Sequence, residues 1–145
     1  ERLVIAAEAL GHGRVALERA SDYAVEREVF GRSIGQNQAI QHPLAEAYAH
    51  LQAAKEVVYS SAELVDDLDP KEAGLRANVA KYLAAEAAYM AADAAVQVHG
   101  GFGVAREYDV ERFFRDARVA KIAPVTHELI LSYVAENALD LPRSY

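Results

Sequence analysis

Apolar residues recur at helical spacing along four long stretches of the chain, and the first stretch is the most regular. Leu3, Leu10, Leu17 and Ala24 return every seven residues, with small residues beside them and charged residues on the other faces. A narrow apolar seam of this period is typical of an amphipathic helix that packs against a partner helix. The glycines within residues 31–35 predict the end of this helix.

Two further helices are predicted by the residues at their ends. Proline suits the first turn of a helix, so the second helix is expected to begin near His42 and Pro43 and to stop at a run of aspartates. The third is expected over Pro70–His99, with Asp69 as its N-cap and Glu72 three residues later, as in a capping box. Its many alanines allow close approach of neighbouring helices, which predicts a central position.

The last helical stretch contains a proline that divides it. It begins near Tyr108 and runs past Val119, Pro124 interrupts it, and a final helix is expected over residues 126–139. No strand-like alternation competes with this pattern. The sequence therefore predicts an all-α fold: an antiparallel four-helix bundle (up-down-up-down) with the last helix kinked or split.

Composition narrows the possible partners. The 145 residues are 52% hydrophobic and 26% charged, and carry a net charge of -7. An acidic surface argues against nucleic acid and anionic membranes as main partners, and no apolar run approaches a membrane span. The absence of cysteine removes disulfides and cysteine-ligated metals, and a zinc site is not expected. The only methionine is Met90, so we expect residues 1–145 to be one domain of a longer, non-secreted protein.

Two glycine-containing segments have the composition of ligand loops. Residues 27–38 combine an arginine, an aromatic ring, two glycines and several amides, groups that suit a polar ligand bearing phosphate. Residues 97–103 hold three glycines in four positions, which permits close approach of backbone N–H groups to an anion. A plain helix connection and a helix C-cap with a tight turn are the alternative interpretations.

Two other polar segments are better explained by ordinary helix chemistry. Arg112, Arg115, Arg118 and Lys121 are spaced three apart. Glu111 lies four residues before Arg115, which favours a solvated helix face with internal ion pairs. At Thr126-His127-Glu128 the threonine is expected to cap the final helix, leaving N–H groups that can meet an anion.

In this order, the segments resemble the C-terminal helical domain of the acyl-CoA dehydrogenases over nearly the whole chain. Arg27-x-x-Phe30-Gly31 with Gln38 is similar to the first flavin-contacting segment of that family, and residues 97–101 are similar to its second. Residues 111–118 resemble the stretch that leads into its active-site loop. Three motifs in the right order at matching separations are more specific than any one of them.

The resemblance implies a flavoenzyme made of an N-terminal helical domain, a middle β-domain and this bundle, assembled as a homodimer or homotetramer. It implies FAD bound partly across a subunit interface, an acyl-CoA substrate, and electron-transfer flavoprotein as electron acceptor. The implied location is the bacterial cytoplasm or the mitochondrial matrix. The positions that match cofactor contacts are Arg27, Phe30, Asn37, Gln38, Gln97, Val98, His99, Gly100, Gly101, Thr126 and Glu128. Asn37 stands where many members have histidine.

The catalytic base implied by the resemblance lies at the start of the chain. Many family members carry a glutamate in the active-site loop, but that position holds Pro124 here, which cannot take a proton. A minority, including the isovaleryl and long-chain enzymes, place it in a Glu-Arg-Leu stretch, and this chain opens Glu1-Arg2-Leu3. Glu1 is therefore the expected base, with Arg2, Pro124 and Val125 beside the acyl-CoA. The alternative for Glu1 is a surface glutamate favoured by the helix dipole.

Three other functions remain open at this point. The first is a relative without dehydrogenation that holds FAD or serves as the structural subunit of a heteromer, which Pro124 supports. The second is an acyl-CoA oxidase, in which the reduced flavin reacts with oxygen. The third is a helical interaction module that binds no ligand.

Overall fold

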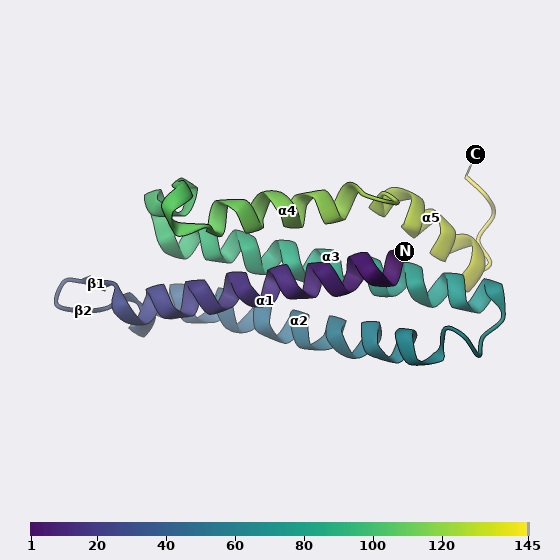
Figure 1. Cartoon of the computed structure of the whole chain (residues 1–145), viewed down its shortest axis with the longest axis horizontal. Helices are drawn as coiled ribbons and strands as arrows, with labels where there is room; N and C mark the ends of the chain where they lie inside the picture. Colours follow the sequence, from purple (N-terminus) through teal and green to yellow (C-terminus); the bar gives the residue numbers. More distant parts are fainter. Residues whose placement is uncertain (145) are drawn as a thin grey trace.

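Long antiparallel helices make up most of the computed structural model, which describes residues 1–144 (Figure 1). The helices are α1 (Arg2–Glu26), α2 (Gln38–Leu64), α3 (Pro70–His99), α4 (Val110–Ile122) and α5 (His127–Ala138). A short hairpin of β1 (Glu28–Val29) and β2 (Arg32–Ser33) follows α1, and the 3-10 turns are η1 (Ile34–Gln36), η2 (Gly100–Val104) and η3 (Arg106–Tyr108). The all-α, up-down-up-down bundle predicted from the sequence is confirmed.

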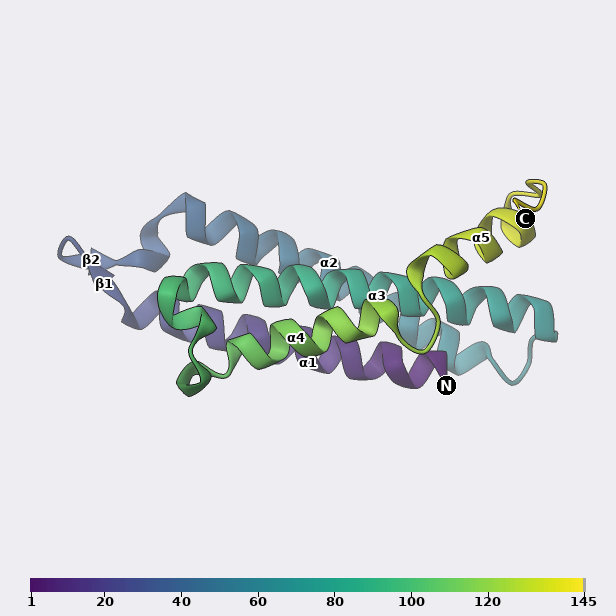
Figure 2. The same cartoon turned by 90° about the horizontal axis from the view of Figure 1, so that it is seen from above.

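Helix α3 lies at the centre of the bundle. It contacts α1, α2, α4 and α5, and Figure 2 shows it running between α2 and α4. Alanines along its length are fully buried, namely Ala80, Ala84, Ala85, Ala88, Ala91, Ala92 and Ala95. Since alanine carries only a methyl group, neighbouring helices approach α3 closely, and the predicted central position is confirmed.

Local capping residues fix both ends of α3. The Asp69 carboxylate accepts hydrogen bonds from the backbone N–H groups of Lys71 and Glu72, at 2.9 and 3.1 Å. At the other end Gly100 adopts φ 59°, a left-handed conformation that favours glycine. The predicted bounds of this helix are therefore confirmed at both ends.

Helix α2 begins earlier than the sequence pattern predicted. Asn37 is its N-cap, and the expectation that it begins near His42 and Pro43 was wrong. The amides of the preceding segment explain the difference, because Asn37 Nδ2 donates to the carbonyl of Ile34 (2.9 Å) and Gln41 Nε2 to that of Gly35 (2.8 Å). These bonds join η1 to the first turn of the helix, and Pro43 lies inside α2 on its exposed side.

The hairpin was not predicted, because strands of two residues are too short to show an alternating pattern in the sequence. Glu28 pairs with Ser33 and Val29 with Arg32 in antiparallel register. The two turn residues both have positive φ, 54° at Phe30 and 76° at Gly31, as two-residue hairpin turns with matching twist require. Figure 1 shows the hairpin projecting beyond the end of the bundle.

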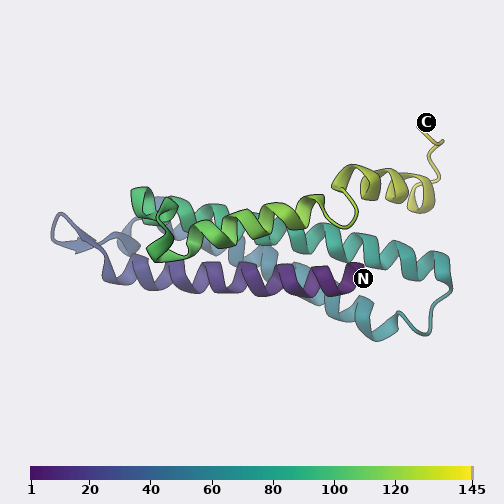
Figure 3. The ribbon, with the colours of Figure 1, turned by 45° about the horizontal axis from the view of Figure 1, so that its top comes forward.

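The predicted split of the last helix is confirmed. Helix α4 ends at Ile122, the Ala123–Pro124 peptide bond is cis, and α5 starts at His127. The Thr126 hydroxyl oxygen accepts a hydrogen bond from the backbone N–H of Leu129 at 3.4 Å, so the predicted cap is present. Figure 3 shows α5 leaving the line of α4 after this connection. Within residues 1–144, none of the helices combines the length and the apolar character needed to cross a bilayer.

Two glycines of α1 test the close packing of the helices. A Cβ at Gly13 would lie 2.7 Å from Leu51 Cδ2 and 3.0 Å from the Ala88 Cα, whereas one at Gly11 would meet nothing within 4 Å. We expect Gly13→Ala to lower the free energy of unfolding by about 1–3 kcal/mol through overpacking. Gly11→Ala should raise it by about 0.5–1 kcal/mol through helix propensity. Chemical denaturation measures both, and equal changes in the two variants would contradict the packing described here.

Candidate functional site

The hairpin presents an aromatic ring at its tip and an arginine at its base to solvent. Phe30 is 101% exposed, and Arg27 lies at the base of the hairpin with an exposed side chain. The guanidinium of Arg27 makes no hydrogen bond or ion pair with another described residue; its backbone carbonyl accepts from Ile34 at 2.8 Å and fixes the hairpin base. An open arginine fork beside an open ring suits a ligand that carries both phosphate and an aromatic group.

Asn37 belongs to the framework of this segment. Its Oδ1 accepts a hydrogen bond from Arg32 Nη2 at 2.9 Å, while its Nδ2 donates to Ile34. The Ser33 hydroxyl adds a bond to the Ala24 carbonyl at 2.6 Å, which ties the hairpin to α1. The side chain of Gln38 is exposed and has no partner among the described residues, so Gln38 is open to a ligand, as Arg27 is.

The second glycine segment is divided between open and buried residues. Gln97, Gly100 and Gly101 are exposed, whereas Val98 and His99 are buried. A Cβ at Gly100 or Gly101 would meet nothing within 4 Å, so their backbone stands open to a ligand. A Cβ at Gly103 would instead overlap the backbone of Val96, so this glycine serves the packing of η2 on α3.

His99 holds the two segments at the same end of the bundle. Its Nδ1 lies 2.8 Å from the carbonyl of Ala95, so this nitrogen carries the proton and donates it. Its ring stacks on Tyr23 of α1 with centroids 4.2 Å apart, and meets Tyr108 edge-on at 5.7 Å. The structure thus brings the hairpin and the glycine segment to one end, with His99 and Val98 supporting them from inside.

The expected base, Glu1, lies near the connection between α4 and α5, far along α1 from the hairpin. All three ribbon views place the start of α1 beside the connection between α4 and α5 (Figures 1 to 3). Ile5 and Ala123 also line one hollow of about 250 Å³ between α1 and α4. Glu1 and Pro124 are exposed, and Arg2 and Val125 are half-buried beside them. The two positions that the family resemblance offers for a base, Glu1 and Pro124, are therefore neighbours in the fold.

A buried charged cluster beneath this connection escaped the sequence interpretation. Lys81 is fully buried and donates from Nζ to the Val125 carbonyl at 2.8 Å. Glu86 accepts from Lys121 Nζ at 2.8 and 2.9 Å and lies 2.8 Å from His127 Nδ1. A lysine and a glutamate five residues apart in an otherwise alanine-rich helix were the only signal in the sequence.

Burial and charge shift the titration of this cluster in definite directions. Burial lowers the pKa of Lys81, with Glu128 and Glu86 opposing the shift. Burial would raise the pKa of Glu86, but hydrogen bonds and charge from Lys121 and His127 outweigh it, and the pKa is lowered. Burial also lowers the pKa of His127, helped by repulsion from Lys81 and opposed by the bond to Glu86. His127 is therefore neutral at pH 7 and donates from Nδ1 to the Glu86 carboxylate.

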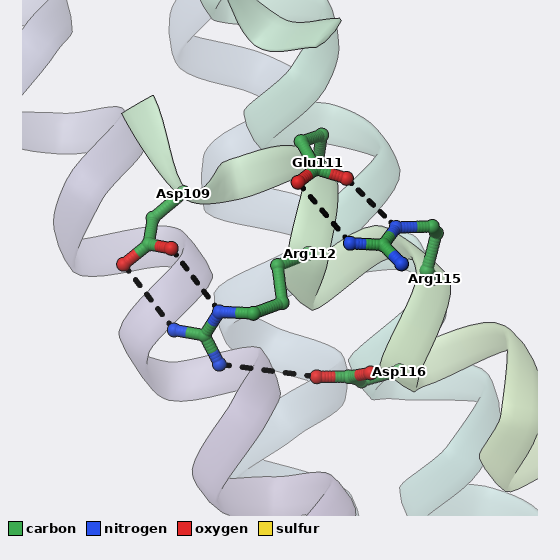
Figure 4. Close-up of polar contacts among 5 residues, drawn as sticks. All are labelled: Asp109, Glu111, Arg112, Arg115 and Asp116. Atoms are coloured by element: carbon green, nitrogen blue, oxygen red, sulfur yellow. Dashed lines mark hydrogen bonds and ion pairs between the residues drawn. The ribbon is translucent and has the colours of Figure 1, made fainter. Parts of the chain in front are cut away.

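The row of basic residues on α4 is largely satisfied by its own helix. Figure 4 shows Arg112 against Asp109 and Asp116, and Arg115 against Glu111. Arg112 lies 3.1 Å from Asp109 and 3.9 Å from Asp116, and Arg115 makes a two-pronged contact with Glu111 at 2.7 and 3.2 Å. The interpretation as a solvated, ion-paired helix face is confirmed for these two arginines, whereas Lys121 turns inward to Glu86.

The first turn of α5 offers one further carboxylate near the connection. Glu128 is exposed, and its pKa is lowered by hydrogen bonds from its own backbone N–H and from the Thr126 hydroxyl. Thr126 is half-buried, so the two residues expected to contact flavin lie side by side at the start of the helix.

Comparison with known proteins identifies the class. Residues 1–139 match the family described as "Acyl-CoA dehydrogenase, C-terminal domain". Acyl-CoA dehydrogenase FadE12 of Mycobacterium tuberculosis is 46% identical over 145 residues, covering 100% of this chain and 37% of its own. The CarC subunit of the caffeyl-CoA reductase-Etf complex of Acetobacterium woodii is 41% identical over 128 residues, covering 88% of this chain and 33% of its own.

A solved structure agrees with the sequence relatives. Butyryl-CoA dehydrogenase from Megasphaera elsdenii superposes with a TM-score of 0.89 at 33% identity, covering 95% of this chain and 36% of that one. The chain belongs to the acyl-CoA dehydrogenase family and corresponds to its C-terminal helical domain. It spans little more than a third of the length of the relatives it matches.

The lowered pKa of His127 predicts a loss of stability in mild acid. As pH falls below about 6.5, unfolded His127 takes up a proton that the folded state resists, so the free energy of unfolding decreases. The lowered pKa of Glu86 adds a similar loss below about 4.5. Urea denaturation at a series of pH values measures this. His127→Gln keeps a donor for Glu86 without titrating, so its curve should be flatter between about pH 6.5 and 5; an unchanged slope would contradict the assignment.

Proposed function

We propose that this chain is the C-terminal domain of an FAD-dependent enzyme that removes two hydrogens from an acyl-CoA thioester. Two regions of this bundle, far apart along α1, carry exposed groups that suit a ligand. Their separation is the observation that carries the proposal. Arg27 and Phe30 stand open at one end, and Glu1 stands beside Pro124 at the other region. Similarity to proteins named acyl-CoA dehydrogenase supports the reaction class.

The residues at the hairpin end fit the phosphate and adenosine portions of FAD. Arg27 is the partner for the pyrophosphate, Phe30 lies against the adenine, and Gln38 adds polar contacts. Gln97, Gly100 and Gly101 offer one amide side chain and an uncovered backbone on the adjoining segment. Asn37, Val98 and His99 support these contacts from within through the bonds and packing described above.

The length of α1 favours FAD shared between subunits. The helix has 25 residues and therefore spans about 37 Å, at about 1.5 Å per residue. One dinucleotide cannot reach Arg27 and Glu1 of the same chain over that distance. The hairpin end therefore serves the FAD of a neighbouring subunit, and Thr126 and Glu128 serve the flavin of their own subunit. A homodimer or homotetramer satisfies this arrangement.

Glu1 is the proposed catalytic base. When bound, FAD supplies the acceptor for the hydride that leaves the β-carbon. The protein must place a carboxylate at the α-proton, and Glu1 is exposed at the start of α1 with no partner among the described residues. Arg2, Pro124 and Val125 border the same place and shape the acyl-CoA site.

The electron acceptor we propose is an electron-transfer flavoprotein. Support comes from CarC, whose name places it in a complex with Etf. The location we propose is the bacterial cytoplasm or the mitochondrial matrix, in keeping with the bacterial relatives and a mitochondrial short-chain enzyme of Bos taurus that is 38% identical.

Substitution of Glu1 tests the base in the full-length, FAD-containing protein. We expect Glu1→Gln to slow anaerobic flavin reduction by acyl-CoA by a factor of about 10²–10⁴, while FAD content stays the same. Glu8→Gln changes another exposed carboxylate of α1, about two helical turns away, and should reduce flavin like the wild type. Equal rates in Glu1→Gln and wild type would rule out Glu1.

Reduction of the wild-type flavin by acyl-CoA, measured in the same way, separates the alternative functions. A wild-type flavin that no acyl-CoA bleaches would support a catalytically silent subunit that holds FAD, to which Pro124 points. Hydrogen peroxide formed without an electron-transfer partner would identify an acyl-CoA oxidase.

Removal of the hairpin ring tests cofactor contact. Phe30→Ala should weaken FAD binding about 5- to 150-fold, since stacking of a base on an aromatic side chain contributes about 1–3 kcal/mol. Tyr48→Ala is the matched control, because Tyr48 is an exposed ring on α2 (59% exposed) outside the proposed site. Equilibrium binding of FAD to the apoprotein measures both, and equal affinities in the two variants would contradict the proposed contact.

A further inference from the structure

The connection between α4 and α5 is attached to α3 at its beginning, middle and end. Lys121, in the last turn of α4, reaches Glu86 at 2.8 Å. His127, the first residue of α5, reaches the same carboxylate at 2.8 Å. Between them the Val125 carbonyl accepts from buried Lys81 at 2.8 Å. Two side chains of one helix, Lys81 and Glu86, therefore hold residues 121–127 at three points.

We propose that Glu86 is a positioning residue for the acyl-CoA site: by binding Lys121 and His127 it fixes the 123–126 connection, with Lys81 holding its centre. The proposal rests on the proposed function, which puts Pro124 and Val125 on the wall of that site. Since Pro124 carries no carboxylate, this connection contributes shape to the site and takes no part in proton transfer. The position of this connection therefore sets the shape of the site that the acyl-CoA enters.

Charge makes Glu86 the central member of the cluster. Among the described residues it is the one carboxylate that touches both Lys121 and His127, and its charge also opposes the lowering of the Lys81 pKa. From α5, Glu128 is the other carboxylate that acts on Lys81. Without the charge of Glu86, the positive charges of Lys81 and Lys121 would have little opposite charge near them. Burying charge without a partner costs free energy. The ends of the connection would then separate from α3.

Aromatic rings restrict where the two ends can go. The His127 ring lies 4.7 Å from the ring of Tyr82, and Lys121 Nζ lies 4.8 Å from the ring centre of Tyr89. Both tyrosines belong to α3, so the attachments are directional and the connection has one preferred position. This geometry suits a wall that must present Pro124 at a fixed place.

Hydrogen exchange in the full-length, FAD-containing protein tests the attachment without any reference to activity. We expect Glu86→Gln to accelerate amide exchange of residues 123–129 at least about tenfold, with the rest of α3 unchanged. Glu72→Gln is the matched control: Glu72 is on the same helix, is 48% exposed and pairs only with Arg76 at 3.4 Å. It should exchange like the wild type. Unchanged exchange of residues 123–129 in Glu86→Gln would overturn the proposal.

Binding and rate separate positioning from general damage to the fold. Glu86→Gln should raise the dissociation constant for acyl-CoA, followed by flavin absorbance, about tenfold. The limiting rate of flavin reduction at saturating acyl-CoA should stay within about threefold, because the base is elsewhere. A lower limiting rate with unchanged affinity would overturn the role. If the wild-type flavin is not bleached by any acyl-CoA, the proposed function fails, while the exchange result still decides whether Glu86 holds the connection.

A second pair of variants covers the case in which Glu86→Gln does not fold. Glu86→Asp keeps the charge on a shorter side chain, and His127→Gln keeps a donor but removes the ring contact with Tyr82. Each should raise exchange by a smaller factor, confined to residues 123–129. Exchange spread evenly over α3 would show that the cluster stabilises the bundle in general and would overturn the positioning role.

Discussion

Close packing of neighbouring helices against the alanines of α3 is the constraint on which the rest of the structure depends. Methyl groups at Ala84, Ala88 and Ala92 leave no exposed surface, and a glycine of α1 lies where even one added carbon would strike α2 and α3. Since α3 touches every other long helix, it fixes how they lie against one another. The packing of the other helices on α3 therefore places both the hairpin end and the start of α1.

The same close packing explains why the charged groups of the cluster are paired and hydrogen-bonded. Burying a charge is costly unless hydrogen bonds and an opposite charge compensate it. Lys81 meets this requirement through a carbonyl of the 123–126 connection, and Glu86 meets it through Lys121 and His127. Buried polar groups on the central helix therefore need partners from another segment. Here the partners lie in and beside the 123–126 connection, which borders the proposed acyl-CoA site.

In the proposed function, the FAD contacts and the catalytic base are separated along the length of α1. His99 and the rings around it gather the hairpin and the glycine segment at one end, while the start of α1 lies beside the connection between α4 and α5. In the proposed function, the length of α1 keeps one FAD molecule from reaching both regions of the same chain. Assembly with a second copy is thus a geometric consequence of the proposed function.

The sequence by itself determined the features that depend on neighbouring residues. Asp69 with Pro70, Gly100, Pro124 and Thr126 set helix ends through hydrogen bonds and backbone angles within a few positions, and those ends were predicted. Two local features were not predicted because their sequence signals are weak, and only the tertiary structure decided the features that depend on distant partners. The start of α2 follows from amides that bond to the preceding turn, and the hairpin turns at Phe30-Gly31, a pair without the usual asparagine signal. Lys81 and Glu86 act on residues 35 to 44 positions away, which no local pattern records.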